Sequence, residues 1–173
     1  MKIVVLDGYT LNPGDLSWDE IGKLGELTVY DRTPTSKIVE RTRKAEIILT
    51  NKAPVSAITL KKLPDLKFIT VMATGYDIVD ITAAGRRGIP VSNVPEYGTN
   101  SVAQFIFALL LELSHHVGAH QEAVKAGDWT ASLDWCFWKT PQVLLKGKKM
   151  GIVGFGRIGS RVGELAHAFG MEV

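Results

Sequence analysis

The chain has 173 residues, 46% hydrophobic and 22% charged, which is the composition of a folded globular protein and excludes a disordered or fibrous one. Its 20 basic and 18 acidic side chains give a net charge of +2 and form no basic stripe interleaved with aromatic residues, so we expect no nucleic-acid partner. Cys136 is the only cysteine, which excludes an intrachain disulfide and favours a reducing, cytoplasmic location.

No segment of the sequence predicts export or membrane insertion. The N-terminus runs into a short apolar segment, 1–6, with neither a basic leader nor a small-residue cleavage site. The most apolar stretch, 102–113, includes Gln104 and Glu112 and falls well short of the ~20 residues that span a bilayer. We therefore expect a buried helix there and no membrane partner.

Residues 1–98 alternate short β-branched runs with helix-like runs, a pattern typical of βαβ units on a parallel sheet. Five strands are predicted, at 3–6, 27–30, 47–50, 68–71 and 90–92. Helices are predicted between them, near 18–23, 35–43, 56–61 and 80–86. Ser17 with Glu20 forms a capping-box pattern, and Ser56 and Asp80 are typical N-cap residues. The pattern predicts a small open α/β domain.

Open parallel sheets bind ligands outside the carboxyl ends of their strands. In this sequence that edge receives Asn51 and Lys52 after the third predicted strand, and Ala-Thr-Gly-Tyr-Asp, residues 73–77, after the fourth. A plain glycine-containing turn explains 73–77 as well as an anion site does, so both interpretations stay open on spacing alone.

Beyond residue 98 the pattern changes to one long helix, 101–117, which is apolar on almost every face. Such a helix has to be covered on all sides, which predicts a place between domains or between subunits. The segment 127–140 then carries three tryptophans and a phenylalanine, namely Trp129, Trp135, Phe137 and Trp138. We interpret this segment as core or subunit packing in preference to a ligand cage, because large aromatic side chains usually serve burial.

A glycine-rich motif of the form G-x-G-x-x-G is made by Gly154, Gly156 and Gly159. It follows a predicted strand, 150–153, and opens a segment with helical periodicity that ends at Gly170. This context favours dinucleotide binding over a bare structural turn.

Each part of the motif has a physical role in binding a dinucleotide. Gly154 permits a tight turn, Gly156 lets the backbone approach a pyrophosphate, and Gly159 lets helix and strand pack closely. Backbone N–H groups around Arg157 and Ile158, at the positive end of the helix dipole, would hold the phosphates.

The acidic residue that binds the adenosine ribose is expected roughly 20 positions into such a motif, at the end of the next strand. That strand opens at Met171, and the chain stops at Val173. We therefore expect a fragment of a longer protein that holds half of a dinucleotide-binding domain.

Several segments of the sequence, together with the glycine motif, resemble the D-isomer-specific 2-hydroxyacid dehydrogenases. Residues 73–80, Ala-Thr-Gly-Tyr-Asp-Ile-Val-Asp, are similar to that family's A-T-G-x-D-x-V-D segment, with Ile78 where asparagine is usual. Residues 88–95 and 97–104 are similar to its interdomain crossover and the start of its long helix. The glycerate dehydrogenase (hydroxypyruvate reductase) branch is the most similar, although phosphoglycerate, lactate-type and formate-type relatives share the same skeleton. This comparison rests on Asn51-Lys52, 101–104 and the tryptophan-rich 127–138.

The resemblance implies a flavodoxin-like substrate domain over 1–98, followed over 99–173 by the interdomain helix and the first βα unit of a truncated Rossmann domain. It implies hydride transfer between NAD or NADP and a small 2-oxo or 2-hydroxy acid, such as hydroxypyruvate or glyoxylate. It also implies a homodimer formed through the helix 101–117.

Carried over residue by residue, the resemblance implies that Thr74 and Gly75 present backbone N–H groups to the substrate carboxylate, with Thr74 also beside the cofactor. Lys52 would lie at the other end of the substrate, and Arg157 and Ile158 would bind the pyrophosphate. The family's catalytic Arg, Glu and His lie downstream of the second nucleotide-binding strand. We therefore expect no catalytic residue within 1–173, and we expect this chain alone to be inactive.

Other chemistries are less well supported by the sequence. His116 and His120 have the i, i+4 spacing of metal ligands, but Val117 stands where a zincin has glutamate, so we expect no metal. No G-x-S-x-G nucleophile elbow occurs, and Cys136 is expected to be a small buried hydrophobe. The alternative function is a dinucleotide-sensing binding module or co-regulator of the same fold. An inactive interaction fragment is disfavoured, since it would leave an apolar sheet face exposed.

Overall fold

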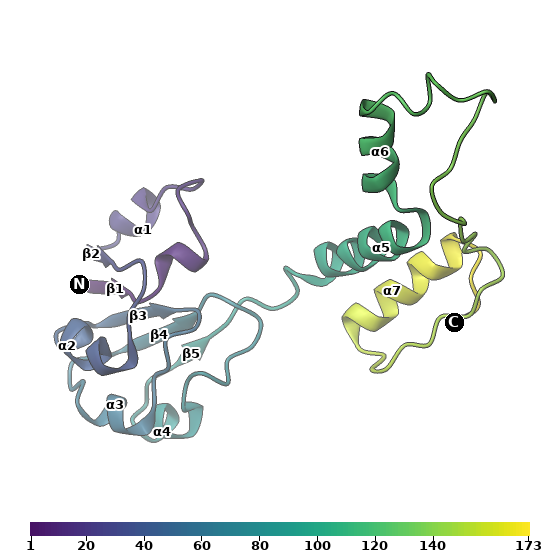
Figure 1. The fold of residues 1–173 in the computed structure, drawn as a ribbon. Helices are drawn as coiled ribbons and strands as arrows, with labels where there is room; N and C mark the ends of the chain where they lie inside the picture. The colour runs from purple at the N-terminus through teal and green to yellow at the C-terminus, as the bar shows by residue number, and fades with distance from the viewer. The chain divides into compact units, whose positions relative to one another are not determined.

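A computed structural model describes residues 1–173. The chain forms two compact units, unit 1 (Met1–Tyr97) and unit 2 (Gly98–Val173) (Figure 1). This division lies one residue from the boundary expected between 98 and 99.

Unit 1 is built on a five-stranded parallel sheet in the order β2-β1-β3-β4-β5. The strands are β1 (Lys2–Val5), β2 (Glu26–Val29), β3 (Ile47–Thr50), β4 (Phe68–Val71) and β5 (Val91–Ser92). Each predicted strand lies within one residue of the observed one. The order is that of a flavodoxin-like sheet, so the predicted fold class is confirmed.

Short helices connect the strands of unit 1. They are η1 (Gly8–Thr10), α1 (Asp19–Gly22), η2 (Thr35–Lys37), α2 (Ile38–Thr42), α3 (Ala57–Lys61) and α4 (Ile81–Arg86). Ser56 and Asp80 cap α3 and α4 by accepting hydrogen bonds from the backbone N–H groups three residues on, which confirms both predicted N-caps.

The predicted capping box at the start of α1 is wrong. The N-cap is Trp18, without a side-chain cap, because the Ser17 hydroxyl accepts from the Asp19 N–H at 3.0 Å. Glu20 pairs instead with Lys23, which lies on the same face of the helix. A local i to i+2 bond of the serine hydroxyl has thus replaced the cap.

The core of unit 1 lies on both faces of the sheet, as the alternation along β1 illustrates. Val4 packs into the larger cluster with Leu60 of α3 and Ala84 of α4. Ile3 points to the opposite face, where Ile21 of α1 packs against the second cluster. Helices therefore cover both faces, which explains the continuous apolar runs of the strands (Figure 1).

Unit 2 contains three helices, α5 (Thr99–His115), α6 (Val117–Lys125) and α7 (Arg157–Ala168). Ala103 and Phe107 of α5 are buried with Val162 and Ala166 of α7, and the Phe107 ring stacks on Phe169 with 5.0 Å between centroids. No single helix is long and apolar enough to cross a membrane, and α5 with α6 meets the criteria only as a pair bent by 57°.

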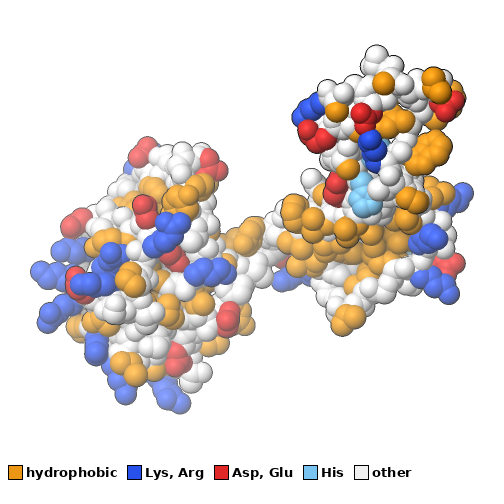
Figure 2. All heavy atoms as spheres, in the orientation of Figure 1, with side chains coloured by type: hydrophobic (Ala, Val, Ile, Leu, Met, Phe, Trp, Pro, Cys, Tyr) orange, Lys and Arg blue, Asp and Glu red, His pale blue; other side chains and the backbone are white.

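Within unit 2 only one face of α5 is covered. Five large apolar side chains on the opposite face are exposed, and they follow the i, i+3, i+4, i+7, i+11 spacing of a single stripe: Val102, Phe105, Ile106, Leu109 and Leu113. Figure 2 shows hydrophobic side chains gathered over this part of unit 2. We call these five residues the α5 stripe. Its covering by another subunit stays a prediction.

Two further expectations for unit 2 have different outcomes. The aromatic segment 127–140 forms no core within the chain, because Trp129, Trp135 and Trp138 are all more than half exposed, and its alternative role in subunit packing stays a prediction. The strand predicted at 150–153 is not formed, and the only pairing is an isolated bridge between Lys149 and Glu172. A parallel strand needs neighbours along its length, and this segment pairs with other residues at that bridge alone.

Candidate functional site

The carboxyl edge of the sheet in unit 1 brings together the loops that follow β3 and β4. These strands are hydrogen-bonded neighbours, and the Met72 N–H donates to the Thr50 carbonyl at 2.8 Å just beyond them. The loop that carries Lys52 and the turn that carries Thr74 and Gly75 therefore leave the sheet side by side, as predicted. Whether these residues bind a substrate stays a prediction.

The turn 73–77 is fixed by the loop that follows β5. The Thr74 hydroxyl donates to the Val94 carbonyl at 3.1 Å, and the Asn93 side-chain amide donates to the Thr74 carbonyl at 2.8 Å. The backbone N–H groups of Thr74 and Gly75 have no acceptor in the structure, and both residues are exposed. A turn with unfilled N–H groups at a strand end is suited to bind an anion.

The loop that carries Lys52 is held by a carboxylate that the sequence reasoning missed. Asp7 follows β1 and is buried, and it accepts hydrogen bonds from the backbone N–H groups of Asn51, Lys52 and Ala53. The Lys52 side chain is exposed and has no ion-pair partner. The only sequence signal for Asp7 is an acidic residue directly after the buried run 3–6.

The glycine motif of unit 2 has the conformation expected of a tight turn before a helix. Gly154 has a φ of +93°, a region that favours glycine. A Cβ on Gly159 would collide with the Gly154 carbonyl oxygen, so this glycine lets the helix pack closely on the turn, whereas the predicted strand partner is not formed. A Cβ on Gly156 would meet nothing within 4 Å. No neighbouring protein atom therefore requires a glycine at position 156, and the space beside its backbone is open to a ligand.

The N-terminus of α7 fits the pyrophosphate group of a dinucleotide. Gly156 is the N-cap and supplies no side-chain cap, and the Ile158 N–H is among the first in the helix, which have no intrahelical acceptor. Together with the helix dipole, these N–H groups favour a phosphate. The binding roles of Gly154, Gly156, Arg157, Ile158 and Gly159 are predictions that this geometry allows.

No histidine belongs to these loops, and Cys136 belongs to the segment between α6 and α7. His120 donates from Nδ1 to the His116 carbonyl at 2.8 Å, and its Nε2 accepts from the Lys139 N–H at 3.1 Å. Both ring nitrogens are thus in use, and no group of three or more candidate metal ligands occurs in 1–173. Cys136 is half-buried and lines a cavity of about 380 Å³ with Trp135 and Phe137, so it is less buried than expected.

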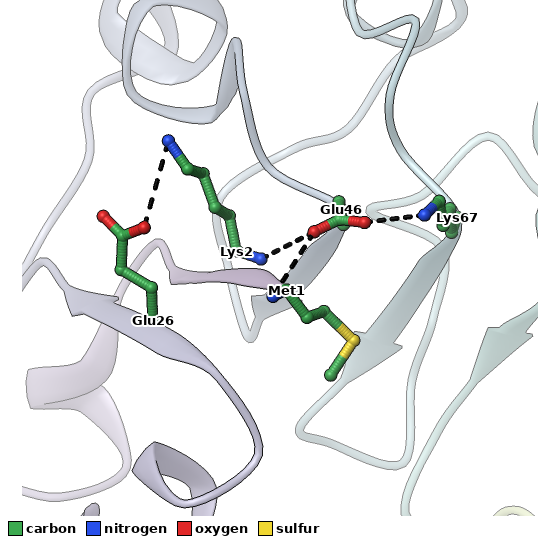
Figure 3. Close-up of polar contacts among 5 residues, drawn as sticks. All are labelled: Met1, Lys2, Glu26, Glu46 and Lys67. Atoms are coloured by element: carbon green, nitrogen blue, oxygen red, sulfur yellow. Dashed lines mark hydrogen bonds and ion pairs between the residues drawn. The ribbon is translucent and has the colours of Figure 1, made fainter.

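A charge cluster lies at the opposite, amino edge of the sheet (Figure 3). Glu46 accepts from Lys67 Nζ at 2.6 Å and from the Lys2 N–H at 2.9 Å, and it lies 3.8 Å from the Met1 ammonium. The Lys67 ammonium, followed by the Lys2 N–H, holds the pKa of the Glu46 carboxyl below its ordinary value. The Glu46 carboxylate raises the pKa of Lys67 in return. This cluster links the N-terminal ends of β1, β3 and β4 and is not part of the candidate site.

The family can be assigned from comparison with known proteins. The family model of the D-isomer specific 2-hydroxyacid dehydrogenase catalytic domain matches residues 3–149. The chain therefore belongs to the D-isomer-specific 2-hydroxyacid dehydrogenase family.

Two curated relatives show which members of the family this chain is similar to. The chain is 52% identical to a hydroxypyruvate reductase of Blautia hydrogenotrophica, covering 100% of this chain and 55% of the relative. It is 39% identical to a glycerate dehydrogenase of Methylorubrum extorquens, covering 99% and 54%. The chain thus spans about half the length of the curated relatives it matches.

Solved structures agree with the fold. An acyclic imino acid reductase in complex with NADPH and D-Arg matches with a TM-score of 0.74 and 27% identity, over 100% of this chain and 55% of that one. A protein from Thermus thermophilus matches with a TM-score of 0.76 and 28% identity, over 99% and 54%.

Proposed function

We propose that this chain is part of an NADH- or NADPH-dependent reductase of small 2-oxo acids, which converts hydroxypyruvate or glyoxylate to D-glycerate or glycolate. The observation that carries the proposal is the carboxyl edge of unit 1, where unfilled N–H groups of Thr74 and Gly75 leave the sheet beside the exposed, unpaired Lys52. The relatives named hydroxypyruvate reductase and glycerate dehydrogenase support the choice of substrate.

The chemistry of a 2-oxo acid suits these groups. The carboxylate would accept hydrogen bonds from the N–H groups of Thr74 and Gly75, which cost little to reorganise because Asn93 and Val94 already fix the turn. The Lys52 ammonium would attract the anionic substrate and contact its other end. We expect the acid that protonates the carbonyl oxygen outside 1–173, since no histidine of the chain lies in these loops.

A bound nicotinamide cofactor would supply the hydride. Within this chain the pyrophosphate would be held by Gly154, Gly156, Arg157, Ile158 and Gly159, with Thr74 beside the cofactor. The support is the open space at Gly156 and the uncapped start of α7. The structure favours neither NAD nor NADP.

We also propose a homodimer formed through α5. The α5 stripe is a continuous apolar surface of the kind that protein interfaces cover. The lone, half-buried Cys136 is consistent with a reducing, cytoplasmic location, which we propose as well.

The proposal is tested with the full-length protein. It should oxidise NADH or NADPH when given hydroxypyruvate or glyoxylate, followed by the loss of absorbance of the reduced cofactor, whereas residues 1–173 alone should not. Lys52→Met should raise KM about tenfold, equivalent to ~1.4 kcal/mol, with a smaller change in kcat. Lys61→Met is the matched control, because Lys61 is an exposed lysine of α3 and not of the carboxyl edge.

The contrary outcomes are distinct. No turnover across a panel of small 2-oxo acids would overturn the reductase. Cofactor binding without turnover would instead support a dinucleotide-sensing binding module or co-regulator of the same fold. An equal rise of KM in Lys52→Met and Lys61→Met would remove Lys52 from the substrate site.

A further inference from the structure

Asp7 is a buried ionisable group that the proposed chemistry does not use. Its side chain belongs to a residue only 4% exposed, at the carboxyl end of β1. Burying a carboxylate is costly unless it is charge-paired or fully hydrogen-bonded. No lysine or arginine pairs with Asp7, so its partners must be sought among backbone groups.

Those partners are three consecutive backbone N–H groups of the loop after β3. Asn51 donates to the two oxygens at 2.8 and 3.1 Å, Ala53 donates to Oδ2 at 2.9 Å, and Lys52 donates to the same oxygen. Successive N–H groups that converge on one anion form a concave anion site. Here the protein fills that site with its own carboxylate, across 44 to 46 residues of sequence.

The surrounding contacts make the loop rigid. The Thr50 hydroxyl donates to the Ala53 carbonyl at 2.7 Å, and the Asn51 side-chain amide donates to the Thr10 hydroxyl at 2.9 Å. The Leu6 N–H donates to the Leu49 carbonyl at 3.0 Å, which ties the end of β1 to β3 directly before the loop.

The hydrogen bonds to Asp7 determine where Lys52 lies. Asn51 and Ala53 are buried and held by Asp7, whereas Lys52 between them is exposed. With both neighbours fixed, the Lys52 side chain can only start from one place at the carboxyl edge. The same edge thus carries N–H groups that converge on Asp7 and, at Thr74 and Gly75, N–H groups without an acceptor.

We propose that Asp7 is a positioning residue, which fixes the Lys52 loop for the substrate and leaves Thr74 and Gly75 as the open anion site. This inference rests on the proposed function, since it assigns Asp7 to the same site. Asp7 acts through Lys52 and touches no reacting atom.

The test is a double-mutant cycle in the full-length protein. Asp7→Asn keeps the shape but offers one acceptor oxygen where two are used, and it turns an amide toward N–H donors. We expect KM for hydroxypyruvate to rise about threefold to tenfold with kcat changed less than about twofold. When Asp7→Asn is added to Lys52→Met, KM for hydroxypyruvate should rise by less than about a further twofold, because the residue that Asp7 positions is already absent.

Two further variants separate positioning from general loss of stability. Thr50→Val is isosteric and removes only the hydrogen bond to the Ala53 carbonyl, so it should raise KM by a smaller factor than Asp7→Asn does. If Asp7→Asn fails to fold, Thr50→Val replaces it as the test of how the loop is held. Ile38→Val destabilises the buried core of unit 1 without touching the loop and should leave KM unchanged. An equal rise of KM for Asp7→Asn with and without Lys52 would overturn the inference.

Amide hydrogen exchange of residues 51–53 provides a readout that needs no turnover. Asp7→Asn should exchange faster there than the unchanged protein, while the amides of β4 keep their protection. Unchanged exchange at 51–53 would overturn the positioning role even if the reductase is real. Faster exchange in a protein that turns over no 2-oxo acid would leave the role of Asp7 in the loop intact and sink the proposed function instead.

Discussion

The two units bury their apolar side chains to very different degrees. In unit 1 helices cover both faces of the sheet, and residues such as Leu60 and Ile48 are completely buried. In unit 2 one face of α5 packs on α7, while the α5 stripe, Trp135 and Val153 remain in contact with solvent. The difference shows that unit 1 forms closed apolar clusters on both faces of its sheet, whereas in unit 2 the apolar cluster lies on one face of α5 and the opposite apolar face is exposed.

The largest expected effect comes from truncating the core of unit 1. Leu60→Ala should lower the free energy of unfolding by about 2–5 kcal/mol, because it leaves a cavity in a closed cluster. Leu113→Ala, at a residue 74% exposed in the single chain, should stay within about 0.5 kcal/mol at protein concentrations where the protein is monomeric, and should cost more at concentrations where the proposed homodimer forms. Urea unfolding at two protein concentrations measures both. A large cost for Leu113→Ala that grows with concentration would mean that a second copy covers the α5 stripe, as the homodimer proposal requires.

The glycines of unit 2 should separate stability from binding. Gly159→Ala should destabilise the full-length protein by about 1–3 kcal/mol, because its Cβ would collide with the Gly154 carbonyl. Gly156→Val should leave stability nearly unchanged and abolish NADH binding, since its side chain would fill the space where the backbone approaches the pyrophosphate. Thermal unfolding and NADH titration check the pair. Full NADH affinity in Gly156→Val would remove this glycine from the cofactor site.

The smallest effect concerns the charge cluster at the amino edge of unit 1. Because the pKa of Glu46 is lowered by Lys67, the stabilisation is complete above the ordinary glutamate pKa of about 4.3 and is lost as the pH falls through the folded value. The pKa of Lys67 is raised, so the pair loses its stabilisation in base as well. This contribution is complete below the ordinary lysine pKa of about 10.4 and is lost as the pH rises through the folded pKa of Lys67.

Glu46→Gln should therefore be less stable than the unchanged protein near neutral pH, with the difference shrinking below about pH 4. Lys67→Met should show the same trend in acid, since it removes the group that lowers the pKa of Glu46. Urea unfolding as a function of pH measures both variants. A difference that stays constant down to about pH 3 would show that the pair does not couple folding to protonation.

Local pattern was enough to predict most of unit 1. The alternating and helical runs placed every strand within one residue, and Ser56 and Asp80 marked two helix starts through their own side chains. The rule that ligands bind at carboxyl ends then assigned Lys52, Thr74 and Gly75 to one edge. These features depend on neighbours in sequence or on strand order, which an alternating βα pattern restricts strongly.

The sequence by itself thus determined the sheet, the edge that carries the candidate site and the glycine turn, because each follows from backbone preferences of adjacent residues. Only the tertiary structure decided that Asp7 accepts the N–H groups of the Lys52 loop, that unit 2 covers only one face of α5 and that residues 150–153 form no strand. Each of these depends on contacts between residues that are distant in sequence. The periodicity of apolar residues predicts which side chains will be buried, but it does not predict which residues will pack against them.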